Sequence, residues 1–179
     1  MDRKTDSGKS LKIKSNPLQK MTQDIKSLLN ALNETPRLLK ELISEINPEL
    51  YKQELVKRKW SIHEHATHIA VGDRHGFQKR FADFKQLEHP VFKPLSGESF
   101  PTHYFMELDL FESIDAFFDL RQSTLTMARA LHPNSWNKEA THPEYKKYTP
   151  YIMLRHLLMH DHNHLYKIET MGLEIETIK

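Results

Sequence analysis

The sequence predicts an all-α fold, a four-helix bundle with long loops after the second and third helices. Glycine is scarce, with five residues among 179, and no stretch sustains the alternation of apolar and polar residues that marks β-strands. Apolar residues instead recur at helical spacing over four long stretches, and prolines mark the segments between them. We expect a single helical domain at residues 16–179, preceded by a basic, flexible tail at residues 1–15.

The first predicted helix begins near Pro17 and ends before Asn47-Pro48, with apolar residues three or four positions apart from Leu18 to Ile46. Pro36 lies inside this stretch. Because proline lacks a backbone N–H, we expect it to bend or break the helix.

The second predicted helix runs from Ser61 to about Phe84, and Ser61-Ile-His-Glu64 fits a capping box at its start. Three prolines follow within residues 85–105. They predict a long irregular loop, and loops of that length are often functional. We expect this loop to cover a pocket.

The third predicted helix spans Met106 to Leu131 and ends before His132-Pro133, after which a second long loop begins. Thr149-Pro150 supplies an N-cap and a first-turn proline for the fourth helix, which ends near Gly172.

Composition excludes several classes of protein. Cysteine is absent, which removes disulfides and thiolate metal ligands, so any soft-metal site must use histidine. No apolar run approaches the roughly 18 residues of a membrane span, and no signal peptide is apparent, so we expect a cytoplasmic protein with no membrane partner. The net charge of +2 is too small to indicate a nucleic-acid-binding protein, although six of the first 20 residues are Lys or Arg.

The fourth predicted helix carries the run His156-Leu-Leu-Met-His160-Asp-His-Asn-His164. At about 100° per residue, His160 and His164 differ by roughly 40° around the axis and about 6 Å along it, so both rings can reach one ion. His156 extends the same face as an alternative ligand, and Asp161 can orient an imidazole. His162 lies about 200° from His160 and should point away.

The second predicted helix supplies the third ligand, because catalytic sites of the zinc type commonly have three protein ligands and an open position. Of the three histidines in its first turns, His68 is the predicted ligand. His65 is a substitute ligand or a hydrogen-bond partner of a ligand, and His63 is expected to be solvated near the helix start. Glu64 is assigned to the capping box.

Other metal and nucleophile motifs do not fit. In the zincin motif His-Glu-x-x-His, Thr67 stands where the second histidine belongs. Glu139-Ala-Thr-His142 has di-iron spacing, but it runs into Pro143 and has no twin. No serine nucleophile elbow, phosphate loop or dinucleotide fingerprint occurs.

Three sequence segments, in their order along the chain, resemble those of a known protein family. Trp60-Ser-Ile-His-Glu-His-Ala-Thr-His68-Ile-Ala-Val-Gly-Asp-Arg opens the second helix, Phe111 to Arg121 is aromatic with an arginine, and Thr149-Pro150 leads to His160-Asp-His-Asn-His164-Leu-Tyr-Lys-Ile. Together they resemble the DinB-like, or YfiT-like, superfamily of metal-dependent four-helix-bundle proteins.

That resemblance implies a three-histidine centre at His68, His160 and His164, holding one divalent ion, zinc or nickel, with the remaining positions left to water or substrate. It also implies a homodimer and, for some members, transfer of a low-molecular-weight thiol to a small-molecule substrate. The extra histidines at 65, 156 and 162 depart from the pattern and leave the ligand set open to substitution.

Three functions follow as alternatives. The first, preferred on the resemblance, is a thiol-dependent S-transferase that uses an external thiol; the second is a metal-dependent hydrolase. The third is a non-catalytic stress-response or binding module with a structural or vestigial metal. A fourth protein ligand, such as His65 or His156, would indicate the third, because structural zinc sites are saturated by protein. In each case we expect the ion at one end of the bundle.

Overall fold

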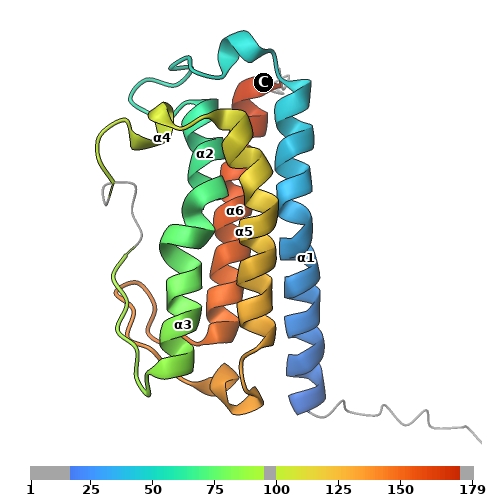
Figure 1. Cartoon of the computed structure of the whole chain (residues 1–179), viewed down its shortest axis with the longest axis vertical. Coiled ribbons are helices and arrows are strands. Elements are labelled where there is room, and N and C mark those ends of the chain that lie inside the picture. Colours follow the sequence, from blue (N-terminus) through green and yellow to red (C-terminus); the bar gives the residue numbers. More distant parts are fainter. Residues whose placement is uncertain (1–16, 95–99, 174–179) are drawn as a thin grey trace, which may run out of the picture.

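The computed structural model describes residues 17–94 and 100–173, and its described part is a bundle of long helices without β-strands (Figure 1). The predicted fold class is thereby confirmed. The predicted basic tail at residues 1–15 lies outside the described residues. No helix in the described ranges is long and apolar enough to cross a membrane.

Four helices form the bundle: α1 (Pro17–Glu45), α2 (Ile62–Gly72), α5 (Leu110–Arg129) and α6 (Pro150–Gly172). Both α1 and α2 pack against α5 and α6, so α1 and α2 occupy opposite corners. The chain between them, which includes the 3₁₀ turn η1 (Pro48–Leu50), crosses one end of the bundle (Figure 1). This diagonal crossing brings the histidines of α2 next to those of α6.

Helix α1 continues through Pro36 and is not broken there, contrary to one of the two expected outcomes. Proline removes the N–H that would bond the carbonyl four residues earlier, at Leu32. That carbonyl oxygen instead accepts hydrogen bonds from Nη1 of Arg121 at 3.0 Å and from Oγ1 of Thr35 at 2.9 Å. Side chains therefore replace the missing helix bond.

The second predicted helix is interrupted by a π-helical turn. Helix α2 leads into η2 (Asp73–Phe77), which is π-helical, and then into α3 (Gln78–Gln86). The capping box at its start is present, with Ser61 and Glu64 bonding each other's backbone amides. An inserted residue rotates the following face by about 100°, so α3 presents a different face to the bundle than an unbroken helix would.

The third predicted helix is split at its start. A short helix, α4 (Tyr104–Glu107), ends before Asp109, whose side chain caps α5 by accepting from the Glu112 amide at 2.9 Å. Two buried side chains of α2 hold this segment: Thr67 donates to the Phe105 carbonyl at 2.9 Å, and Nε2 of His63 lies 2.9 Å from the Leu108 carbonyl.

The two long loops, after α3 and after α5, contact each other. The Thr141 amide donates to the Pro90 carbonyl, and the Phe92 amide donates to the Thr141 carbonyl, both at 2.9 Å. The loop after α5 contains the 3₁₀ turn η4 (Pro133–Asn137) and also pairs with itself between Ala140 and Tyr148. These bonds hold His142 in a defined position beside α6.

The core has two apolar clusters with a polar layer between them. Each cluster takes residues from all four corners of the bundle. Each corner of the bundle contributes one buried polar residue to the layer between the clusters: Thr35, Asp73, Arg121 and Asp161. The candidate site lies at the edge of this layer.

Candidate metal centre

Three histidines converge between α2 and α6. His68, His160 and His164 each offer one ring nitrogen, and these atoms all lie within 4.8 Å of one another. Nε2 of His68 and Nε2 of His160 are only 2.9 Å apart. Two nitrogens that bind one ion with metal–nitrogen bonds of about 2.0–2.1 Å are at most about 4.2 Å apart. The pair at 2.9 Å meets that limit, and a small rotation of a ring would bring a nitrogen at up to 4.8 Å within it. These are the three residues that the sequence predicted as ligands.

Two neighbouring side chains orient these rings. Oδ1 of Asp161 lies 3.3 Å from Nδ1 of His160, and Nδ1 of His65 lies 2.7 Å from Nδ1 of His164. In both histidines the Nδ1 atom is thus engaged, which leaves Nε2 available to an ion. Metal-binding histidines commonly have such a partner on the other ring nitrogen, because it selects the tautomer and the ring orientation.

The buried rings favour the neutral form that binds metals. Burial lowers the pKa of His68 to about 3 and that of His65 to about 4, and it also lowers the pKa of His164. The nearby histidines reinforce the shift in His68 and His164. A neutral imidazole has one free lone pair, so no proton has to be displaced before an ion binds.

The surroundings of His68 show whether the site suits a metal ion. Its Nδ1 atom is buried and has no hydrogen-bond partner among the described residues. A buried polar atom without a partner is costly, and an ion bound at this nitrogen, in place of Nε2, would satisfy it. The donor set, three imidazoles without thiolates, suits a transition metal such as zinc, copper, iron or nickel rather than calcium or magnesium.

The site lies part-way along the bundle, not at one end as we expected from the sequence. His160 and His164 are in the middle of α6, and His68 precedes the junction between α2 and the π-helical turn. Because that turn lies halfway along the α2–α3 corner, both apolar clusters flank the triad.

Aromatic rings cover the triad. The ring of Trp60 lies 4.8 Å from that of His68 and 5.9 Å from that of His164, measured between centroids. Phe105, held by Thr67, packs edge-on against His68 at 4.8 Å. The contact between Trp60 and His164 depends on the packing of α6 against α2.

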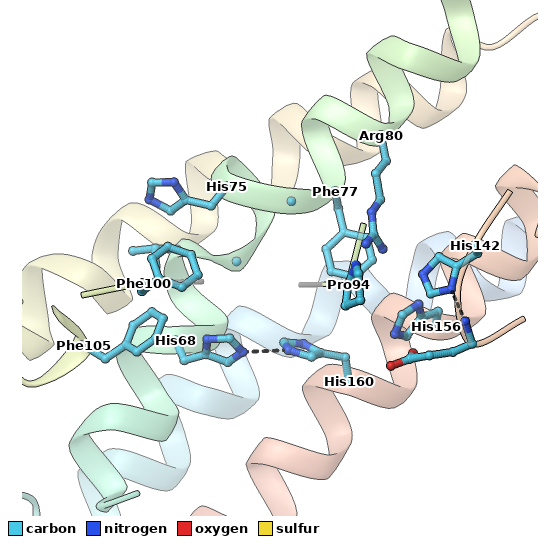
Figure 2. Close-up of a pocket in the computed structure, with 14 residues that line it drawn as sticks. His68, His75, Phe77, Arg80, Pro94, Phe100, Phe105, His142, His156 and His160 are labelled. Carbon is cyan, nitrogen blue, oxygen red and sulfur yellow. Dashed lines mark hydrogen bonds between the residues drawn. The ribbon is translucent and has the colours of Figure 1, made fainter. Parts of the chain in front are cut away.

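A cavity of about 60 Å³ opens beside the triad (Figure 2). His68 and His160 border it, and Figure 2 shows both rings on one side of it with His142 and His156 on the other. Pro94 and Phe100, from the loop after α3, also line it, which agrees with the expectation that this loop covers a pocket. Such a volume holds several waters or a compact ligand group.

The other histidines are distributed differently. His65 and His156, the alternative ligands, are absent from the converging set, since His65 bonds His164 and His156 bonds Tyr148. His162 is exposed, as its helical angle predicted. The prediction for His63 is wrong: it is 3% exposed, because its ring bonds the Leu108 carbonyl.

Comparison with known proteins supplies the family. The sequence profile of the DinB superfamily matches residues 31–168. The chain belongs to the DinB superfamily. No curated protein sequence matches it. YfiT from Bacillus subtilis, described as a probable metal-dependent hydrolase with an unusual four-helix bundle topology, has a similar structure: the TM-score is 0.70, with 16% identity over 90% of this chain and 91% of that one.

In this DinB-superfamily protein, the residues that the sequence did not reveal are polar and buried. Arg121 lies between Asp73 and Asp161, and Arg80 bonds Tyr148. The burial of these two arginines could not be predicted from the sequence, because most arginines in proteins are exposed. The resemblance noted an arginine in the segment that ends at Arg121, but only the fold identifies the partners of Arg121.

Proposed function

We propose that this protein is a metal-dependent enzyme that acts on a small molecule, with one zinc or nickel ion held by His68, His160 and His164. The observation that carries the proposal is the convergence of three ligand nitrogens within 4.8 Å, with two of the rings bordering a cavity. A divalent ion in such a site supplies Lewis acidity, which makes water or a thiol a better nucleophile at neutral pH.

The chain's own residues would serve that chemistry by position. Asp161 and His65 hold two of the ligand rings, and Trp60 and Phe105 exclude water from the face of His68. No fourth protein ligand joins the three among the described residues, which supports a position open to substrate. This argues against the alternative of a closed, structural metal in a non-catalytic stress-response or binding module.

Hydrolysis is the reaction that we propose first. It needs only water besides the substrate, and the similarly folded YfiT is described as a probable hydrolase. At 16% identity that description supports the choice by analogy only.

Thiol transfer is the second candidate, favoured by a separate observation. A further cavity of about 490 Å³ borders His65 and His164, so a different small molecule can approach the triad from each cavity. The chain has no cysteine, so the thiol would come from a cosubstrate. We retain the homodimer, which rests on the resemblance, and the cytoplasmic location, which rests on the sequence features given above, as parts of this proposal.

The site is tested by metal analysis of untagged protein purified without chelators. We expect about one zinc or nickel ion per chain. A His160→Ala, His164→Ala double variant should lose it, whereas His162→Ala, an exposed neighbour on the same helix, should retain it. Equal metal content in all three would remove the site assignment.

The reaction is tested by two screens on the zinc- and nickel-loaded forms. One presents ester and amide substrates, and the other presents an electrophile together with low-molecular-weight thiols. Hydrolysis should occur without thiol, and transfer should require it. Turnover that persists in the double variant would show that the triad is not responsible.

A further inference from the structure

The end of the cavity away from His68 contains a buried cation without a counter-ion. Arg80 is 4% exposed, and no carboxylate of the described residues pairs with it. Its guanidinium lies 5.3 Å from the ring centre of Phe92 and 5.6 Å from that of Phe77. An unpaired charge in such surroundings is costly. By contrast, the other fully buried arginine, Arg121, has two carboxylate partners.

Arg80 also fixes the proton on His156. Its Nη1 donates to the hydroxyl of Tyr148 at 3.2 Å, and that hydroxyl lies 3.0 Å from Nδ1 of His156. A guanidinium can only donate, so the hydroxyl accepts from it. Among the described contacts, Nδ1 of His156 is the acceptor available to the hydroxyl's own hydrogen, so the hydroxyl donates a hydrogen bond to Nδ1. The remaining proton of the neutral ring is then on Nε2. Burial and Arg80 lower the pKa of His156 to about 4, which keeps the ring neutral.

His142 provides a second unused donor. Its Nδ1 accepts from the Glu144 amide at 3.2 Å, so the proton of the neutral ring is on Nε2. That Nε2 atom is buried and has no partner among the described residues. The ring is 6% exposed, stacks on Tyr148 at 4.3 Å between centroids, and lines the same cavity as His156 (Figure 2).

One end of the cavity thus offers hydrogen-bond donors and positive charge, and the other end offers the metal ligands. Arg80 uses two of its five N–H donors, on Tyr148 and on the Lys93 carbonyl, so others remain. A second cation is disfavoured here because Arg80 would repel it. We propose that Arg80, His142 and His156 bind a carboxylate of the substrate while the rest of that molecule extends toward His68 and His160.

This inference rests on the proposed function for the direction of the substrate, but the carboxylate subsite itself does not require the metal. A carboxylate suits the donors because its two oxygens accept in one plane, as Arg and neutral His require. The apolar rings of Phe77, Phe100 and Phe105 line the same cavity and match a carbon skeleton. The substrate class is therefore a compact carboxylic acid.

The charge of Glu144 allows a test that distinguishes carboxylate binding from a purely structural role of these residues. It is exposed and lines the same cavity, and its negative charge opposes a bound carboxylate. Replacing it by glutamine should strengthen carboxylate binding, whereas a structural contribution of Glu144 would leave binding unchanged or weaken it.

The test measures binding of butyrate, succinate, inorganic phosphate and neutral butyramide to the whole protein, by amide and imidazole chemical shifts, in zinc-loaded and chelator-treated forms. We expect a carboxylate to bind both forms, and butyramide to bind at least about tenfold more weakly than butyrate. Arg80→Met should weaken butyrate at least about tenfold, and Glu144→Gln should strengthen it about two- to fivefold. Lys79→Met is the matched control, because Lys79 is an exposed cation on the same helix and pairs with Asp83.

If Arg80→Met does not fold, His142→Phe replaces it, because phenylalanine preserves the stacking on Tyr148 and removes only the N–H. Equal binding of butyramide, unchanged binding in a folded variant, a preference for phosphate, or no saturable binding of either carboxylate would overturn the proposal. Binding confined to the zinc-loaded form would also overturn it, while leaving the proposed function intact. Carboxylate binding by a protein that takes up no metal would sustain the subsite and refute the proposed function.

Discussion

Arg121 and Asp161 form a completely buried ion pair in which Nη2 lies 2.7 Å from Oδ2. The second oxygen of the same carboxylate faces Nδ1 of His160, so one side chain joins the polar layer of the bundle to a proposed metal ligand. Burial alone would raise the pKa of Asp161, but the charge of Arg121 and the bond to His160 lower it. The carboxylate is therefore ionised where it faces the ligand.

Removing Arg121 should strongly destabilise the protein. Arg121→Met leaves Asp73 and Asp161 buried and without their counter-charge, and breaking a buried pair in this way costs about 3–5 kcal/mol. Urea denaturation gives the free energy of unfolding. Arg37→Met is the control: Arg37 pairs with Glu34 and Glu41 at the surface and should matter by less than about 1 kcal/mol. Similar losses in both variants would contradict the assigned role of the buried layer.

Asp161→Asn should weaken metal binding without removing a ligand. An amide is uncharged and increases the basicity of the His160 ring less than a carboxylate does, and loss of such a partner commonly costs about 10–100-fold in affinity. Competition with a chromophoric chelator measures the zinc affinity. A folded Asp161→Asn protein with unchanged affinity would show that this contact does not support the ligand.

His65→Ala distinguishes a ligand from the partner of a ligand. If His65 only orients His164 through its Nδ1, the variant should still bind about one ion per chain, with reduced affinity. His164→Ala, measured alongside, should lose most of the bound metal. The assignment of roles would be reversed if His65→Ala lost the metal and His164→Ala retained it.

The metal-free protein should lose stability as the pH falls from about 6.5 to about 4. Burial places the pKa of His65 and His156 near 4 in the folded protein, against 6.5 ordinarily. Below pH 6.5 the unfolded chain therefore binds protons that the folded protein does not. Stability is complete above this range and declines through it, by up to about 2 kcal/mol for each ring at pH 5.

Urea denaturation at several pH values after chelator treatment measures this decline. His156→Gln should flatten the pH dependence, and His162→Gln, which changes an exposed ring, should leave it unaltered. A pH dependence that is the same in wild type and His156→Gln would mean that this ring is not held neutral by the fold.

The sequence alone determined the helices, the capping box at Ser61 and the metal-ligand candidates on α6. Each depends on residues within about one turn of one another, and the angle between His160 and His164 follows from helix geometry alone. His68 lies beside His160 and His164 in the structure, and its position among small and apolar neighbours marks the buried face of α2.

Tertiary structure decided everything that involves a partner distant in the sequence. The burial of His63 and the continuity of α1 through Pro36 each depend on groups that other segments supply. The same holds for the cation end of the cavity, where α3, α6 and the loop after α5 bring Arg80, His156 and His142 together. The energy of a buried polar group depends on what lies across from it, and local spacing carries no information about that partner.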